Sequence, residues 1–173
     1  MERTGVQKLA AVLRVLVSIT FVCNLVVLPL VPHLVRPYYV EDWLYQELLW
    51  DLSLVWQDIR AVVLMLFLWF CGVCTAVVLW QARRVLSTIL EGKPFQKANS
   101  TSLRRSAVCS FLIAAAALVR LVWGLAYYGT IEPLLSYNAL FVPVFFMGGL
   151  LCLVMSALFR QAAELKAEND LTI

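Results

Sequence analysis

The chain has 173 residues, of which 62% are hydrophobic and 14% are charged, and its formal net charge at pH 7 is +3. A soluble domain is about half apolar and a quarter charged, so the composition excludes an ordinary soluble globular protein. It indicates a chain whose surroundings are lipid, and the length fits one domain.

Four apolar stretches are each long enough to cross a bilayer as a helix, which takes about 20 residues. They are residues 12–31, which should stop before Pro32, then 61–80, 107–128 and 135–158. Because backbone polar groups in hydrocarbon must be satisfied within each segment, helices are the expected structure. The sequence therefore predicts an all-α polytopic membrane protein, a four-transmembrane-helix bundle in which residues 1–173 form a single domain.

Residues 41–58, between the first and second stretches, mix acidic and large apolar side chains at near-helical spacing. We expect an amphipathic helix on the outer leaflet, or an outward extension of the second span. A lid over the bundle is the favoured interpretation of this segment, and a ligand sensor is the alternative.

Basic residues predict the orientation of the chain, because loops rich in Lys and Arg stay in the cytoplasm. Residues 81–106 contain six basic side chains against Glu91, whereas the segment between the first two spans is acidic. Residues 81–106 and both termini are therefore expected to be cytoplasmic.

The second span should continue past the membrane through residues 81–90, since Gly92 favours a helix end and Pro94 prevents continuation. Asn99 or Ser100 is expected to cap the third helix. The predicted result is a helical hairpin with a basic tip.

The last segment, residues 159–173, has helix-favouring composition to about Glu168, and Asn169 can end the helix. Phe159, Ala162, Ala163 and Leu165 are expected to pack on the extended second helix. The acidic end of this tail should clasp the basic hairpin, with its last apolar residues filling a groove or anchoring a partner protein. The predicted clasp or docking residues are Arg83, Arg84, Lys93, Pro94, Phe95, Arg104, Arg105, Glu164, Leu165, Glu168, Asp170, Leu171 and Ile173.

Arg120 is the one charged residue in the third span. A charge within a bilayer costs roughly 2.5–3.5 kcal/mol on insertion scales, so we expect Arg120 to face the bundle with Asn24 and Asn138 as polar neighbours. A packing device is the favoured interpretation of this cluster, and a ligand or ion site is the alternative.

Residues suited to catalysis are scarce. His33 is the single histidine, and Cys71 and Cys74 lie midway through a span, where packing is their expected role. No catalytic residue, metal site or cofactor is predicted, and an enzyme is not expected.

Small residues repeat at four-residue spacing on three spans, which allows helix backbones to approach closely in lipid. They are Gly72 and Ala76, then Ser106, Ser110 and Ala114, then Gly148, Cys152 and Ser156. These faces favour tight packing within the chain and leave a homodimer open.

Three segments carry a family resemblance: "ILEGKPF" (89–95), "NSTSLRRSA" (99–107) and "FRQAAELKAENDLTI" (159–173). They resemble the bacterial membrane family called domain of unknown function 2975. The resemblance implies a four-helix protein of the bacterial cell membrane, often encoded beside a small helix-turn-helix regulator of the Cro/C1 type.

Together these features predict a non-enzymatic multi-pass membrane protein that binds or modulates such a regulator through its hairpin and tail. The alternative is a small transporter or ligand-binding membrane protein that uses the Arg120 cluster. Besides the lipid bilayer, the regulator is the expected partner. Direct nucleic-acid binding is not expected, because Phe95 is the only aromatic residue at the basic tip.

Overall fold

The computed structural model describes residues 5–35, 58–93, 95–135 and 137–170, which form helices and short connections. The four long helices are α1 (Gly5–Val35), α4 (Ile59–Leu90), α5 (Lys97–Tyr128) and α7 (Tyr137–Asp170), and α6 (Glu132–Leu135) is a single turn. All four long helices are long and apolar enough to cross a membrane. The predicted all-α fold with four candidate membrane-spanning helices is confirmed.

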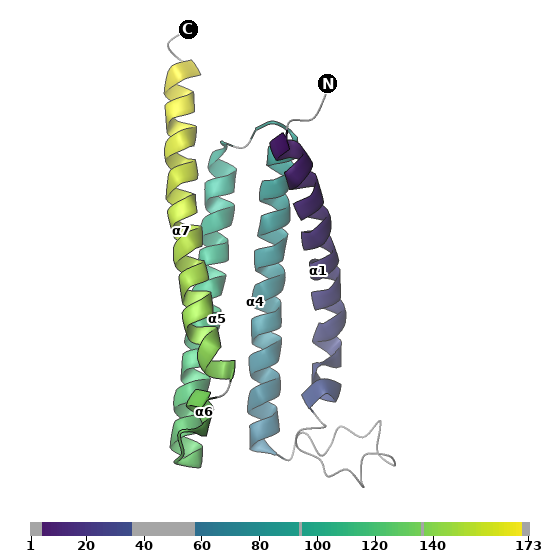
Figure 1. The fold of residues 1–173 in the computed structure, drawn as a ribbon, viewed down its shortest axis with the longest axis vertical. Helices are drawn as coiled ribbons and strands as arrows, with labels where there is room; N and C mark the ends of the chain where they lie inside the picture. The colour runs from purple at the N-terminus through teal and green to yellow at the C-terminus, as the bar shows by residue number, and fades with distance from the viewer. Residues whose placement is uncertain (1–4, 36–57, 94, 136, 171–173) are drawn as a thin grey trace.

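The long helices lie side by side in chain order and alternate in direction (Figure 1). Within the described residues the extensive interfaces are α1–α4, α4–α5 and α5–α7, so the helices form an open row rather than a closed ring. The first turns of α7 also reach α4, where the rings of Phe141 and Phe67 meet edge to face with centroids 6.1 Å apart. The start of α1, the turn between α4 and α5, and the end of α7 all lie at one end of the molecule (Figure 1).

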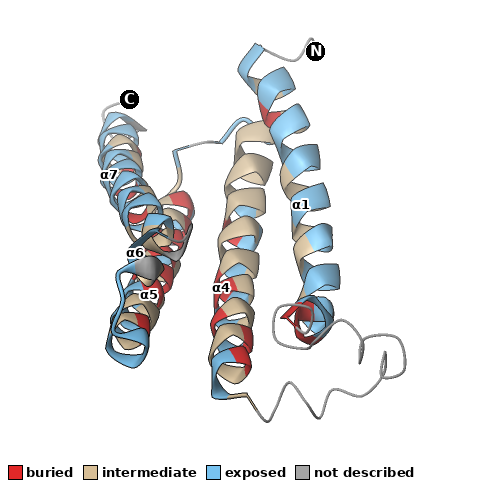
Figure 2. Cartoon of the chain, turned by 60° about the horizontal axis from the view of Figure 1, so that its bottom comes forward, coloured by how far each residue is buried: buried red, intermediate tan, exposed pale blue. Residues whose placement is uncertain are grey.

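Buried side chains gather on the facing sides of α4 and α5, whereas most of α1 is exposed (Figure 2). One core cluster joins α1 to α4, and a second joins α4 to α5. Cys71 and Cys74 belong to the second cluster, so they pack in the core as the sequence predicts. The outward faces carry exposed Leu, Val and Ile, which is the surface expected of helices surrounded by lipid.

The first helix does not stop before Pro32, so that prediction is wrong. A proline inside a helix leaves the carbonyl four residues earlier without its main-chain donor, and for Pro32 this is the carbonyl of Leu28. The indole Nε1 of Trp69 on α4 donates a hydrogen bond to that oxygen at 2.8 Å. A side chain from the neighbouring helix thus replaces the missing bond, and α1 continues to Val35.

In the hairpin between α4 and α5, the end of α4 at Gly92 is as predicted, whereas the start of α5 is not. Gly92 has φ +73°, and the N–H groups of Gly92 and Lys93 donate to the carbonyls of Ile89 and Thr88, which is the Schellman arrangement. The expected cap of α5 by Asn99 or Ser100 is wrong, because Gln96 is the N-cap residue.

Asn99 lies inside α5 instead and is only 1% exposed. Its amide donates to the hydroxyl of Thr88 at 2.7 Å. A short polar residue that the sequence suggested as a cap therefore joins the end of α4 to the start of α5.

The predicted faces of small residues are used within the chain on α5 and only in part on α7. Ser106, Ser110 and Ala114 are buried on α5. On α7 Ser156 is buried as predicted, but an added Cβ at Gly148 would meet nothing within 4 Å. The close approach is instead at Gly149, where an added Cβ would lie 2.8–3.0 Å from ring atoms of Phe111.

The predicted outer segment, residues 41–58, lies outside the described residues except for Asp58. Asp58 is the N-cap of α4 and accepts hydrogen bonds from the backbone N–H and the guanidinium of Arg60. The hydrogen bond from the Arg60 side chain lowers the pKa of Asp58 below its ordinary value.

Candidate functional site

Two serines join α5 and α7 near the end of the molecule where α5 begins. The hydroxyl of Ser100 donates to the carbonyl of Ser156, and the hydroxyl of Ser156 donates to the carbonyl of Ser100, both at 2.9 Å. Ser156 is 7% exposed. Reciprocal bonds between residues 56 positions apart hold the two helices in close contact at this level.

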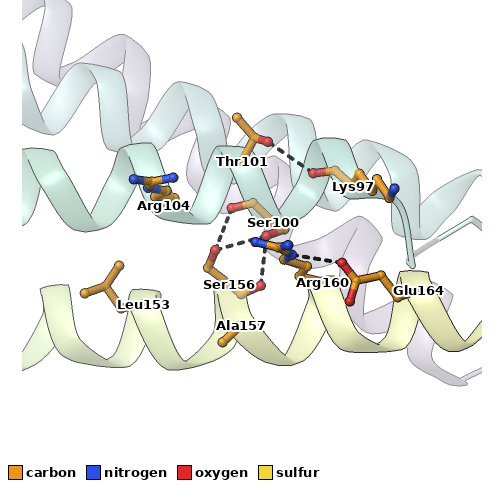
Figure 3. A pocket seen from close by; sticks show the side chains of 9 residues that line it. All are labelled: Lys97, Ser100, Thr101, Arg104, Leu153, Ser156, Ala157, Arg160 and Glu164. Atoms are coloured by element: carbon orange, nitrogen blue, oxygen red, sulfur yellow. Dashed lines mark hydrogen bonds and ion pairs between the residues drawn. The ribbon is translucent and has the colours of Figure 1, made fainter.

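A groove of about 500 Å³ lies over this serine pair, between α5 and α7 (Figure 3). Its charged residues are Lys97 and Arg104 on α5 and Arg160 and Glu164 on α7. The other lining residues are Ser100, Thr101, Leu153, Ser156 and Ala157.

The charges of the groove are unequal. Three basic side chains and one carboxylate give it a formal charge of +2. Arg160 Nε donates to Glu164 Oε1 at 2.9 Å within α7 (Figure 3). Among the described residues no ion pair joins a carboxylate to Lys97 or Arg104. The groove therefore presents a net positive site whose ammonium and guanidinium groups can bind anions. Its serine and threonine hydroxyls donate to backbone carbonyls instead.

The tip of the hairpin contacts α7 through an aromatic pair. The rings of Phe95 and Phe159 lie with centroids 6.0 Å apart. Phe95 remains 50% exposed, Lys93 beside it is exposed, and Pro94 lies outside the described residues.

The predicted packing of the tail on the second helix is wrong. α7 packs along α5, whereas its contact with α4 is much smaller and includes Phe141 in its first turns. Ala163 is buried in that arrangement, but Leu165 is 62% exposed. Beyond Leu165 the helix continues to Asp170 and projects past the start of α5 (Figure 1).

Other predicted clasp residues occupy different places. Glu168 is exposed on the projecting end of α7. Asp170 ends the helix, but its side chain, together with Leu171 and Ile173, lies outside the described part of the chain. Glu164 forms an ion pair with Arg160 of its own helix.

The basic residues of the hairpin do not form one patch. The guanidinium of Arg83 lies 5.6 Å from the ring centroid of Phe21 and 5.8 Å from that of Trp80, at the α1–α4 contact. Arg84 and Arg105 are exposed and do not line the groove. Among the members of the predicted set that the structure describes, Arg104 and Glu164 line it.

Sequence reasoning missed Lys97, Ser100 and Arg160 as groove residues. Arg160 stands four positions before Glu164, a spacing that favours an ion pair on one helix face. The short connection between α5 and α7 favours antiparallel neighbours, but no sequence signal places these side chains around one groove.

The predicted intramembrane cluster is divided between two environments. The guanidinium of Arg120 lies over the ring of Phe67, 4.9 Å from its centroid, a favourable cation–π contact. Asn24 instead lines an apolar pocket of about 260 Å³ that Arg120 does not line. The side chain of Asn138 lies outside the described residues.

Comparison with curated proteins and with solved structures finds no match. The family described as "Protein of unknown function (DUF2975)" matches residues 7–173, nearly the whole chain. The match includes all four long helices except the first two residues of α1, and it includes the groove between α5 and α7. The chain therefore belongs to the DUF2975 family.

Proposed function

We propose that this protein is a non-enzymatic multi-pass protein of the bacterial cell membrane that binds a small helix-turn-helix regulator on its cytoplasmic side. The proposed docking surface consists of the hairpin tip at Phe95 and the projecting end of α7 from Leu165 to Asp170. The regulator as partner comes from the family resemblance of the sequence, and the surface comes from the fold.

The single observation that carries the proposal is the exposure of Leu165. It is 62% exposed on a helical end that projects beyond α5, among charged neighbours that favour water. Contiguous apolar patches rimmed by polar residues mark protein-binding surfaces, so Leu165 is taken together with the exposed ring of Phe95. A single helix face with an apolar anchor and flanking charges is a common way to dock a partner.

The orientation follows from the distribution of basic residues. The same end of the molecule carries the start of α1, the basic hairpin and the end of α7 (Figure 1). Loops rich in Lys and Arg remain in the cytoplasm, so this end faces the compartment that contains transcription factors.

Photo-crosslinking in cells tests the docking surface. A crosslinking amino acid is placed at Leu165, at Phe95, and at Leu151 as the control. Leu151 lies on the same helix and is 63% exposed, but it stands in the apolar span. The adducts are identified by mass spectrometry.

We expect a small DNA-binding protein in the adducts from Leu165 and Phe95, and lipid adducts from Leu151. The proposal is wrong if the first two positions yield only intramolecular adducts, or if Leu151 captures the same protein equally well.

Ligand binding within the membrane is a second candidate, in keeping with the transporter alternative. Asn24 Oδ1 is buried and has no hydrogen-bond partner among the described residues. It lines the apolar pocket with Thr75 and Phe141, so a membrane-soluble molecule that carries a hydroxyl or amide donor would satisfy it.

Extraction of the purified protein and mass spectrometry of the bound small molecules tests this candidate. A specific compound should be lost from Asn24→Leu and retained by Ser18→Ala, a polar change on the same helix. Identical extracts from both variants would remove the candidate.

A further inference from the structure

The groove between α5 and α7 crosses the level at which the apolar part of α7 ends. Leu153 lines its lower part, seven residues before Arg160, or about 10 Å along the helix axis. Lys97 and Glu164 line its other end, beyond the apolar span (Figure 3). One side of the site is therefore in contact with hydrocarbon and the other with charge.

The charged part suits a phosphate group. Lys97, Arg104 and Arg160 supply ammonium and guanidinium donors, and the guanidinium groups can hold two phosphate oxygens at once. Lys97 and Arg104 are exposed, so their charges are available to a ligand. The N-terminal end of α5 adds positive potential at the same place, and its N-cap Gln96 makes no side-chain capping bond.

The apolar part decides which phosphate compound fits. Leu153 and Ala157 are both exposed along the groove, next to the cationic residues. A soluble phosphate ester would leave them unused, whereas the acyl chains of a lipid would cover them. The volume of about 500 Å³ is also larger than a phosphate ion needs and is typical of small-molecule sites.

We infer that this groove is a binding site for the phosphate-bearing headgroup of an anionic phospholipid, with the acyl chains descending past Leu153. Lys97 and Arg104 hold the phosphate. The hydroxyl of Thr101, which also lines the groove, donates to the carbonyl of Lys97 at 3.2 Å. This inference does not depend on the regulator proposed above, because it concerns the chain and the bilayer alone.

Glu164 sets the strength of this site. Its carboxylate accepts the hydrogen bond of Arg160 at 2.9 Å, so a bound phosphate must compete for that guanidinium. Glu164→Gln removes the competing charge and should tighten lipid binding. A gain of affinity cannot come from misfolding, so this variant keeps the test informative.

The experiment titrates the purified full chain in non-ionic detergent with phosphatidylglycerol, and separately with phosphatidylcholine, and measures bound lipid by native mass spectrometry. Lys97→Gln and Arg104→Gln remove groove cations. Arg105→Gln is the matched control, because Arg105 is exposed on the same helix next to Arg104 but does not line the groove. Inorganic phosphate is added as a soluble competitor.

We expect phosphatidylglycerol to bind more tightly than phosphatidylcholine and Glu164→Gln to bind it more tightly still. Each groove substitution should weaken binding roughly fivefold, the factor equivalent to about 1 kcal/mol per basic residue near an anionic surface, and Arg105→Gln by less than about twofold.

Two results would overturn the inference. An equal loss in Arg105→Gln would mean that diffuse surface charge attracts the lipid. Displacement of phosphatidylglycerol by an equal concentration of inorganic phosphate would assign the groove to a soluble phosphate compound.

Discussion

We predict that α1 tolerates Pro32 because the Trp69 indole donates a hydrogen bond to the carbonyl of Leu28. The Nε1 to oxygen distance is 2.8 Å, which is a good N–H···O bond. In Trp69→Phe the carbonyl of Leu28 loses its donor while most of the ring packing remains. An unsatisfied buried polar group costs about 1–3 kcal/mol, and side-chain hydrogen bonds in membrane proteins contribute at most about 1.7 kcal/mol. We expect a loss of about 1 kcal/mol in the free energy of unfolding.

A double-mutant cycle separates this bond from the packing of the indole ring. In Pro32→Ala the residue regains a main-chain N–H, which can donate to the carbonyl of Leu28 as in an ordinary helix. Trp69→Phe should then be less destabilising by about 1 kcal/mol than in the native background. Trp80→Phe is the control, because no acceptor for the Trp80 indole N–H occurs among the described residues. Its ring contacts Phe21 and Arg83 rather than Pro32 or Leu28, so the substitution should have the same effect in both backgrounds.

The assay is reversible unfolding in mixed micelles by titration with sodium dodecyl sulfate, followed by far-ultraviolet circular dichroism. The four corners of the cycle are compared at one protein and detergent concentration. Equal effects of Trp69→Phe with and without Pro32 would falsify the reasoning, since the loss would then come from ring packing and not from the carbonyl that proline leaves unpaired.

Two further predictions use the same assay. Gly149→Ala should lower the free energy of unfolding by about 1–3 kcal/mol, because its Cβ would lie 2.8–3.0 Å from the Phe111 ring. Gly148→Ala is the control and should be neutral or slightly stabilising, because an added Cβ there meets nothing within 4 Å. Equal effects of the two substitutions would contradict the close approach of Gly149 to Phe111. The Arg60 hydrogen bond lowers the pKa of Asp58, so the ionised carboxylate stabilises the folded chain. This stabilisation should be complete above the unfolded pKa of about 3.9 and should be lost as the pH falls through the lower folded pKa. Asp58→Asn should therefore differ from the native chain near neutral pH and converge with it in acid, and a pH-independent difference would refute the assignment.

Local signals in the sequence were sufficient for the number and order of the long apolar helices. A span is defined by about 20 contiguous apolar residues, and its recognition needs no knowledge of neighbours. The end of α4 at Gly92 was equally accessible, because left-handed backbone after a helix is a local preference of glycine. The helical extension of α7 beyond the apolar span followed from composition in the same way.

Helix ends that depend on a distant partner could not be predicted. Pro32 is a helix-ending signal by local rules, and its effect is cancelled by Trp69, 41 residues away from the carbonyl that it bonds. Asn99 resembles a cap by residue type, but contact with Thr88 of the preceding helix gives it a buried position instead.

The sequence alone determined that this chain is an all-α protein with four apolar helices and a basic segment between the second and third, because hydropathy and charge are properties of contiguous residues. Only the tertiary structure decided that α7 packs on α5, which leaves Leu165 exposed and forms the groove between Lys97, Arg104 and Arg160. The physical reason is that helices in lipid are apolar on most faces, so hydropathy does not identify the partner of each face. Small residues and the serine pair determine which helices pack together, because they allow close contact between helices.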